Sequence, residues 1–145
     1  MAKNKRIKSP KINVSKQPKI EQNPDGWYDK HPSWRFSKMD NEHNKWSPCD
    51  NKLIENHLLQ MCNYEKNTWR KLLNDNSHAN HLVDVQNLSK EAQDRLKKLE
   101  ILTDSLIQLR VGGTKRIFGL IEDGVMSILW YDLNHEVYPV EKKHT

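Results

Sequence analysis

Apolar positions change their spacing near residue 104, and this change divides the chain into a helical half and a strand half. Between residues 51 and 74 apolar side chains recur at three- and four-residue intervals, which predicts one amphipathic helix capped by Asp50. A second helix is predicted over residues 89–101, where Ser89 caps the first turn and lysines lie near the end. The predicted buried stripe of the first helix comprises Ile54, Leu58, Met61, Cys62, Trp69 and Leu72.

The last third of the chain has the pattern of strands joined by tight turns. Its apolar runs are separated by a Gly-Gly and an Asp-Gly dipeptide, and glycine tolerates the positive φ that such turns need. The runs span residues 105–111, 115–121 and 126–132. We therefore predict an antiparallel three-stranded meander. Helices that precede a meander indicate an α+β domain with the helices packed on one sheet face.

Alternation along these runs assigns side chains to the two faces of the sheet. In the second run it places Arg116, Phe118 and Leu120 on one face, with Ile117, Gly119 and Ile121 on the other. In the third run strict alternation groups Tyr131 with Val125, Ser127 and Leu129, opposite Met126, Ile128 and Trp130.

Residues 27–50 are rich in aromatic side chains but show no clean period. Large aromatic rings are rarely left in water, so we expect this segment to pack as an irregular or short-strand wrap against the domain. A platform on which nucleic-acid bases stack is the functional alternative. The aromatic residues are Trp27, Tyr28, Trp34, Phe36 and Trp46.

The chain has 145 residues, which suffices for one compact domain, and its net charge is +5. The first 19 residues hold seven of the 24 basic residues and no acid, so residues 20–145 carry 17 basic and 19 acidic groups. Residues 1–26 also lack an apolar period, which predicts a disordered basic tail before a single domain over 27–145. Such a tail acts either as a solubilising segment or as an arm that contacts RNA, a ribosome or a protein partner.

Two cysteines without a CxxC spacing, no apolar run of membrane-spanning length and no signal-peptide core predict a cytoplasmic protein that does not enter the membrane. Zinc is not predicted. His78 and His81 lie three residues apart and Cys49 or Cys62 could join them, but no second closely spaced ligand pair completes a site. We expect no cofactor.

The candidate chemistry lies at one end of the meander. Arg110 and Arg116 flank the Gly-Gly turn, and the third strand returns beside Arg116 to deliver His135. Arginine can hold a phosphate with two donors, and histidine can exchange a proton near neutral pH. The bland alternative is that Arg116 pairs with Glu122 or Glu136 and that His135 is only a turn residue. Groups that could supplement the pair are Arg110, Tyr131, Tyr138, Lys142, Lys143 and His144.

The segment "KRIFGLIEDGVMSILWYDLNHEVY" resembles the C-terminal meander of the RelE/YoeB superfamily of bacterial toxins. The resemblance implies metal-independent cleavage of translated mRNA. It assigns catalytic roles to Arg116, His135 and Tyr138. Departures from the family are the tryptophan-rich lead and the "PVEKKHT" extension. Residues 34–145 are also similar to uncharacterised small bacterial and phage proteins with a KKHT-type tail.

Two functional hypotheses follow. The first is a RelE-like endoribonuclease toxin that acts on RNA or at the ribosome and has a cognate antitoxin. The second is a non-enzymatic binding protein on the same scaffold, such as an inhibitor, an antitoxin-like partner or a phage accessory protein. The slightly acidic body favours the second, and the cluster of basic and proton-exchanging groups near the C-terminus favours the first.

Overall fold

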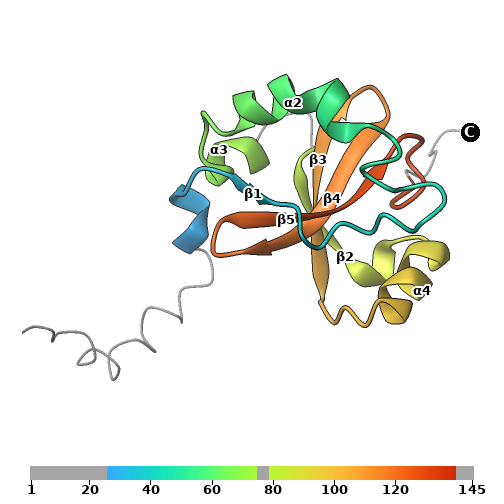
Figure 1. Ribbon diagram of the computed structural model, residues 1–145. Coiled ribbons are helices and arrows are strands. Elements are labelled where there is room, and N and C mark those ends of the chain that lie inside the picture. The colour runs from blue at the N-terminus through green and yellow to red at the C-terminus, as the bar shows by residue number, and fades with distance from the viewer. Residues whose placement is uncertain (1–25, 75–78, 140–145) are drawn as a thin grey trace, which may run out of the picture.

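The computed structural model describes residues 26–74 and 79–139, and its centre is one five-stranded sheet (Figure 1). The sheet order is β1-β5-β4-β3-β2, and all neighbours are antiparallel except the parallel pair β1–β5. The strands are β1 (Ser33–Arg35), β2 (His81–Asp84), β3 (Ser105–Gly112), β4 (Lys115–Glu122) and β5 (Val125–Asp132). The predicted meander and the α+β class are confirmed. The edge strand β2 was not predicted, and β1 lies in the segment for which an irregular or short-strand wrap was expected.

The described residues form three α-helices within the two regions predicted to be helical and two short 3-10 helices that were not predicted. They are η3 (Gly26–Asp29), α2 (Leu53–Tyr64), α3 (Trp69–Leu73), η4 (Val85–Asn87) and α4 (Lys90–Lys98). Ser89 caps α4 as predicted, because its hydroxyl accepts the backbone N–H of Ala92.

The predicted helix over 51–74 is wrong in its continuity and in its cap. The helix breaks between α2 and α3, and Thr68 caps the second piece by accepting the backbone N–H of Lys71. The residue before α2 is Lys52 in a left-handed conformation, not Asp50. The buried stripe also differs, because Ile54 and Leu58 are 38% and 53% exposed. Leu53, Met61 and Tyr64 are buried instead.

Helices cover both faces of the sheet, and the prediction of one covered face is wrong (Figure 1). On the first face α2 and α3 pack over Ile107, Leu109 and Ile117. On the second face α4 packs over Leu106 and Phe118. Neighbouring residues along a strand point to opposite faces, so burial of both Leu106 and Ile107 requires two cores. Near-continuous apolar runs are typical of such strands.

A bulge in β5 breaks the strict alternation predicted for that strand. Phe118 pairs with Trp130 but Gly119 pairs with Ile128, so Leu129 is the extra residue. Leu129 and Trp130 therefore both join the α4 face, whereas Tyr131 turns to the α2 face. Gly119 suits the bulge because a Cβ there would overlap the carbonyl oxygen of Ser127.

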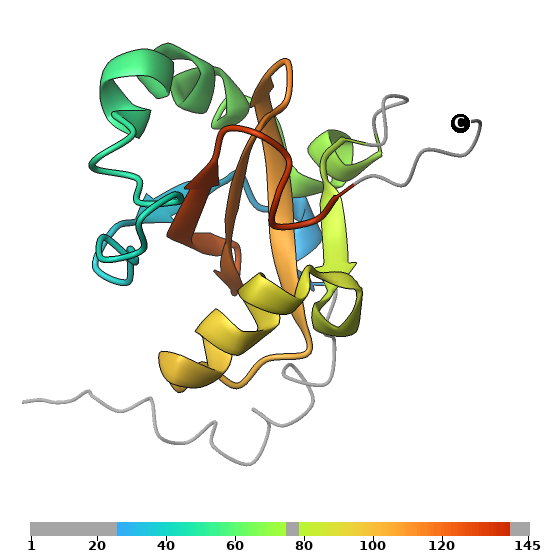
Figure 2. The same ribbon diagram turned by 90° about the vertical axis from the view of Figure 1, so that its right-hand side faces the viewer.

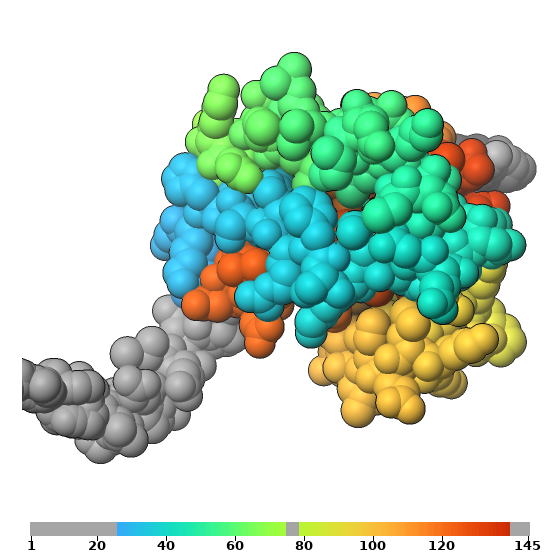
Figure 3. Space-filling model, in the orientation of Figure 1, coloured from blue at the N-terminus to red at the C-terminus, as the bar shows by residue number. Residues whose placement is uncertain are grey.

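The aromatic lead wraps the sheet edge, as Figure 3 shows for the blue and cyan segment between α2 and α4. It contributes η3 and the short strand β1, and Trp46 is fully buried against Trp130. Trp27 and Trp34 are half-buried and pack on the α2 face. The packing interpretation of this segment is confirmed. The predicted basic tail lies outside the described residues except for Gly26.

Candidate functional site

Two arginines face each other across the end of the sheet that carries the Gly-Gly turn. The register pairs Arg110 of β3 directly with Arg116 of β4. Gly112 and Gly113 both have positive φ, so glycine allows the tight connection that brings the two strands together. Both side chains belong to the α4 face by alternation, and we call them the arginine pair.

Neither member of the arginine pair forms an ion pair within the part of the chain that the structure describes. Arg116 donates from Nη1 to the carbonyl oxygens of Gly113 (2.7 Å) and Lys115 (3.1 Å). Its Nε is buried and has no hydrogen-bond partner among the described residues. Burial and the charge of Arg110 lower the pKa of Arg116. Like charges directly opposite each other are unfavourable in a sheet. Among the described residues, Tyr64 and Asp132 act on the pKa of Arg116 in the opposite direction, and neither forms an ion pair with it.

The two carboxylates considered as ion-pair partners of Arg116 lie elsewhere. Glu122 is at the far end of β4, and Glu136 approaches Lys45 at 3.8 Å. Asp132 is opposite Arg116 on β5, but it is fully buried, and burial raises its pKa. Its two oxygens accept the backbone N–H groups of Asn134 (3.2 Å) and Val137 (2.7 Å). Asp132 therefore anchors the following segment.

That segment, the C-terminal strap (residues 133–139), crosses from the end of β5 toward β2 (Figure 2). Thr114 of the Gly-Gly turn donates its hydroxyl to the carbonyl oxygen of Leu133 at 2.7 Å, so the strap begins beside the arginine pair. Further along, the carbonyl oxygen of Val137 accepts the backbone N–H of Ser89 at 2.8 Å, and the Val137 side chain is buried. These contacts fix the strap on the α4 face.

His135 lies on the strap with its ring orientation set by the backbone. Its Nδ1 is 3.1 Å from the carbonyl oxygen of Tyr138. A carbonyl oxygen only accepts, so Nδ1 carries the proton and the neutral ring keeps its lone pair on Nε2. His135 also has φ 62°, a left-handed conformation that is uncommon outside glycine and is found at functional sites. Its Nε2 is suited to accept a proton.

Tyr138 lies beside the edge strand β2 and not beside Arg116. Its ring meets His81 of β2 edge-on, with centroids 5.9 Å apart. Two strand spacings, about 10 Å, separate β2 from β4, so Tyr138 is adjacent to β2 and not to Arg116. The structure thus brings Arg110, Arg116 and the start of the strap together, whereas Tyr138 lies beside His81 of the edge strand β2.

Tyr131 is on the wrong face for the role predicted from the sequence. It is fully buried on the α2 face, where its hydroxyl lies 2.5 Å from Nε2 of His57. The β5 bulge causes this placement, because it shifts the alternation by one residue. Lys142, Lys143 and His144 lie outside the described residues.

Sequence reasoning missed two polar groups near the arginine pair. Gln108 is 2% exposed, and its Nε2 donates to the carbonyl oxygen of Ala79 at 2.7 Å. Its Oε1 has no hydrogen-bond partner within residues 26–74 and 79–139. His81 pairs with Gln108 across β2–β3. Alternation from Arg110 would have placed Gln108 on this face. No sequence signal predicted β2, so His81 could not be placed.

Within residues 26–74 and 79–139, no group of three or more His, Cys, Asp or Glu side chains could hold a metal ion. Cys49 and Cys62 are both exposed and free, and His78 is outside the described residues. None of the described helices has the length and apolar character needed to cross a membrane. No family model, curated protein or solved structure matches the chain.

Proposed function

We propose that the protein cleaves RNA without a metal ion and that the arginine pair holds the scissile phosphate. The observation that carries this proposal is the pair itself: the two arginines face each other, and neither forms an ion pair with a carboxylate of the described residues. A phosphodiester would supply the missing negative charge and accept several of the N–H donors. The described residues hold 15 basic and 15 acidic groups, so attraction for an anion is local to this site.

RNA supplies its own nucleophile, the ribose 2′-hydroxyl. Nε2 of His135 takes the proton of this hydroxyl as its oxygen attacks phosphorus. The bond to the 5′ oxygen breaks, the leaving oxygen takes a proton from solvent, and the products are a 2′,3′-cyclic phosphate and a free 5′-hydroxyl. Arg110 and Arg116 stabilise the negative charge that grows on the phosphoryl oxygens. The resemblance of residues 115–138 to the RelE/YoeB meander supports the same reaction and favours translated mRNA as the substrate and an antitoxin as the partner.

The test compares Arg116→Ala and His135→Asn with the wild-type protein in an RNA-cleavage assay, on naked RNA and on ribosome-bound mRNA. Asparagine tolerates the left-handed backbone of position 135 but does not exchange a proton near neutral pH. Both variants should remain folded and lose about 10²–10⁴-fold in cleavage rate. Arg35→Ala and His31→Ala are matched controls, and neither should change the rate.

Unchanged cleavage by both variants would remove the proposed site. No cleavage by the wild-type protein on either substrate would remove the enzymatic proposal and leave a binding protein. One observation favours that second candidate: α2 exposes Ile54, Leu58 and Leu59, the last by 74%. Growth arrest on induced expression, accompanied by cleaved mRNA, would separate the toxin from the binding protein.

A further inference from the structure

A pocket of about 540 Å³ opens beside the arginine pair, at the edge of β3 that β2 does not cover. β2 pairs with β3 only from Ser105 to Gln108, so the edge from Arg110 to Gly112 borders the pocket. Side chains satisfy the backbone of Arg110 there: Asn80 accepts its N–H at 2.8 Å, and the Tyr64 hydroxyl donates to its carbonyl oxygen. The pocket is therefore a preformed feature of the fold.

The lining of this pocket combines an apolar floor with a polar rim. Leu72 and Val111 are buried in the floor. Gln60 and Asn67 project from the end of α2 and the turn after it, and their side-chain amides hydrogen-bond to no group in the part of the chain that the structure describes. Lys71 adds a positive charge, and none of the described residues that line the pocket is acidic. The volume is within the range of small-molecule sites, about 300–1,000 Å³.

We infer that this pocket receives the base of the nucleotide next to the scissile phosphate, an inference that rests on the proposed function. Arg110 belongs to both features: its side chain shares the α4 face with Arg116, and its strand edge borders the pocket, whose floor is on the α2 face. An RNA strand whose phosphate lies on the arginine pair reaches the pocket at the next nucleoside by passing around this edge, which β2 does not cover. A flat base can lie on the apolar floor, and amide side chains provide both a donor and an acceptor for its edge. Lys71 neutralises the phosphate that follows. Gln60 and Asn67 are then specificity-determining residues.

The first experiment measures binding and does not depend on cleavage. The full chain is titrated with AMP, CMP, GMP and UMP, and separately with inorganic phosphate, while backbone amide signals are followed by NMR. Nucleotides should shift the signals of Gln60, Asn67 and Asn80, and phosphate alone should not. Asn67→Ala and Gln60→Ala should each weaken nucleotide binding about fivefold, the effect of one lost hydrogen bond. Asn56→Ala, an exposed amide on the same helix, is the matched control and should leave binding unchanged.

Equal shifts with phosphate and nucleotides would overturn the inference, as would identical binding by wild type, Asn67→Ala and Gln60→Ala.

The second experiment maps cut sites. Asn67→Ala should lose nucleotide preference by about fivefold while Arg116→Ala loses rate at every site. If wild type cleaves RNA and Asn67→Ala keeps the same preference, the proposed function stands and the base subsite fails. If wild type does not cleave but its nucleotide binding depends on Asn67, the subsite stands and the proposed reaction fails.

Discussion

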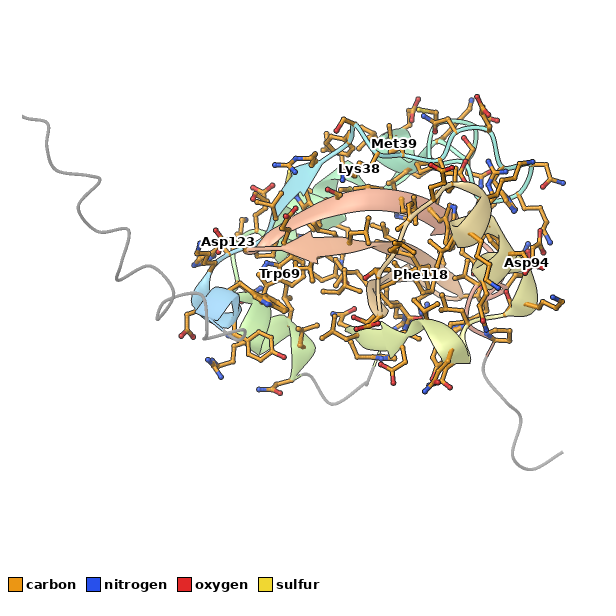
Figure 4. All side chains as sticks on the ribbon, turned by 90° about the horizontal axis from the view of Figure 1, so that it is seen from below. Lys38, Met39, Trp69, Asp94, Phe118 and Asp123 are labelled. Atoms are coloured by element: carbon orange, nitrogen blue, oxygen red, sulfur yellow. The ribbon has the colours of Figure 1, made fainter. Side chains whose placement is uncertain are left out.

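The two ends of β4 carry tight turns of similar sequence character but treat their polar groups differently. At the Asp-Gly end, Lys30 pairs with Asp123 at 2.8 Å, and the indole Nε1 of Trp69 donates to the carbonyl oxygen of Gly124 at 2.8 Å. Figure 4 shows Trp69 and Asp123 at this end of the sheet. At the Gly-Gly end, Arg110 and Arg116 face each other without an ion pair in the described residues.

The two ends of β4 therefore differ in whether their polar groups have partners among the described residues. We call the Asp-Gly end the closed end and the Gly-Gly end the open end. Polar groups at the closed end satisfy one another and hold the aromatic lead against the sheet. Groups at the open end keep unused hydrogen-bonding capacity, which reduces stability and suits a ligand. Substitutions at the closed end should therefore change stability, and substitutions at the open end should change binding.

The largest expected effect is on stability, from Trp69→Ala at the closed end. Trp69 is fully buried and packs against Trp27 and Trp34, and its indole N–H donates to the carbonyl oxygen of Gly124. We expect a loss of about 3–5 kcal/mol in the free energy of unfolding, because the substitution leaves a cavity and an unpaired carbonyl group. Urea denaturation measures it. A loss below about 1 kcal/mol would show that the closed end does not depend on this side chain.

Arg116→Gln at the open end should have the opposite profile. RNA affinity should fall by about tenfold or more, and the slope of log affinity against log salt should decrease by about one, as for the loss of one phosphate contact. The melting temperature should stay unchanged or rise, because the substitution removes repulsion by Arg110. Fluorescence anisotropy across a salt series and thermal unfolding test both statements. A large fall in melting temperature with unchanged RNA affinity would assign Arg116 a structural role.

His57 should make the open end sensitive to acid. Burial and, to a lesser extent, Lys115 lower the pKa of His57 below its ordinary value of 6.5. The unfolded chain then takes up the proton first as pH falls, so stability decreases as pH drops below about 6.5 toward the folded pKa. In His57→Gln, unfolding free energies measured between pH 5 and 8 should show a smaller slope. Part of the slope should remain, because burial also lowers the pKa of His43. An unchanged slope would show that His57 does not contribute to the pH dependence of the unfolding free energy.

The smallest effect concerns the surface ion pair of the closed end. Lys30 and Asp123 are 52% and 78% exposed, so Asp123→Asn should cost about 0–1 kcal/mol of stability and less at high salt. Asparagine tolerates the left-handed conformation of position 123, which keeps the turn intact. Urea denaturation at two salt concentrations measures the change. A loss of several kcal/mol would mean that the ion pair, and not Trp69, holds this end together.

Several parts of this fold and site could be predicted from local sequence alone. The Gly-Gly and Asp-Gly turns specify hairpins through backbone geometry, so β3, β4 and β5 pair as expected. The Ser89 cap is likewise a contact between residues three apart. The position of Arg110 opposite Arg116 follows from the same turn. Hairpin geometry therefore predicts which of these residues are neighbours, and their roles in a site stay predictions.

Tertiary structure decided the rest, because the relevant partners are distant in the sequence. β2 exists only through its pairing with β3, and β1 only through its pairing with β5. The bulge that turns Tyr131 to the α2 face appears only when β4 and β5 are aligned. Because the sheet is buried on both sides, α4 packs on the face opposite α2 and α3. The sequence could not show whether Glu136 would neutralise Arg116. In the folded chain Glu136 lies toward Lys45 instead. The sequence by itself determined the arginine pair, and only packing left that pair without an ion pair to an acidic residue of the described chain.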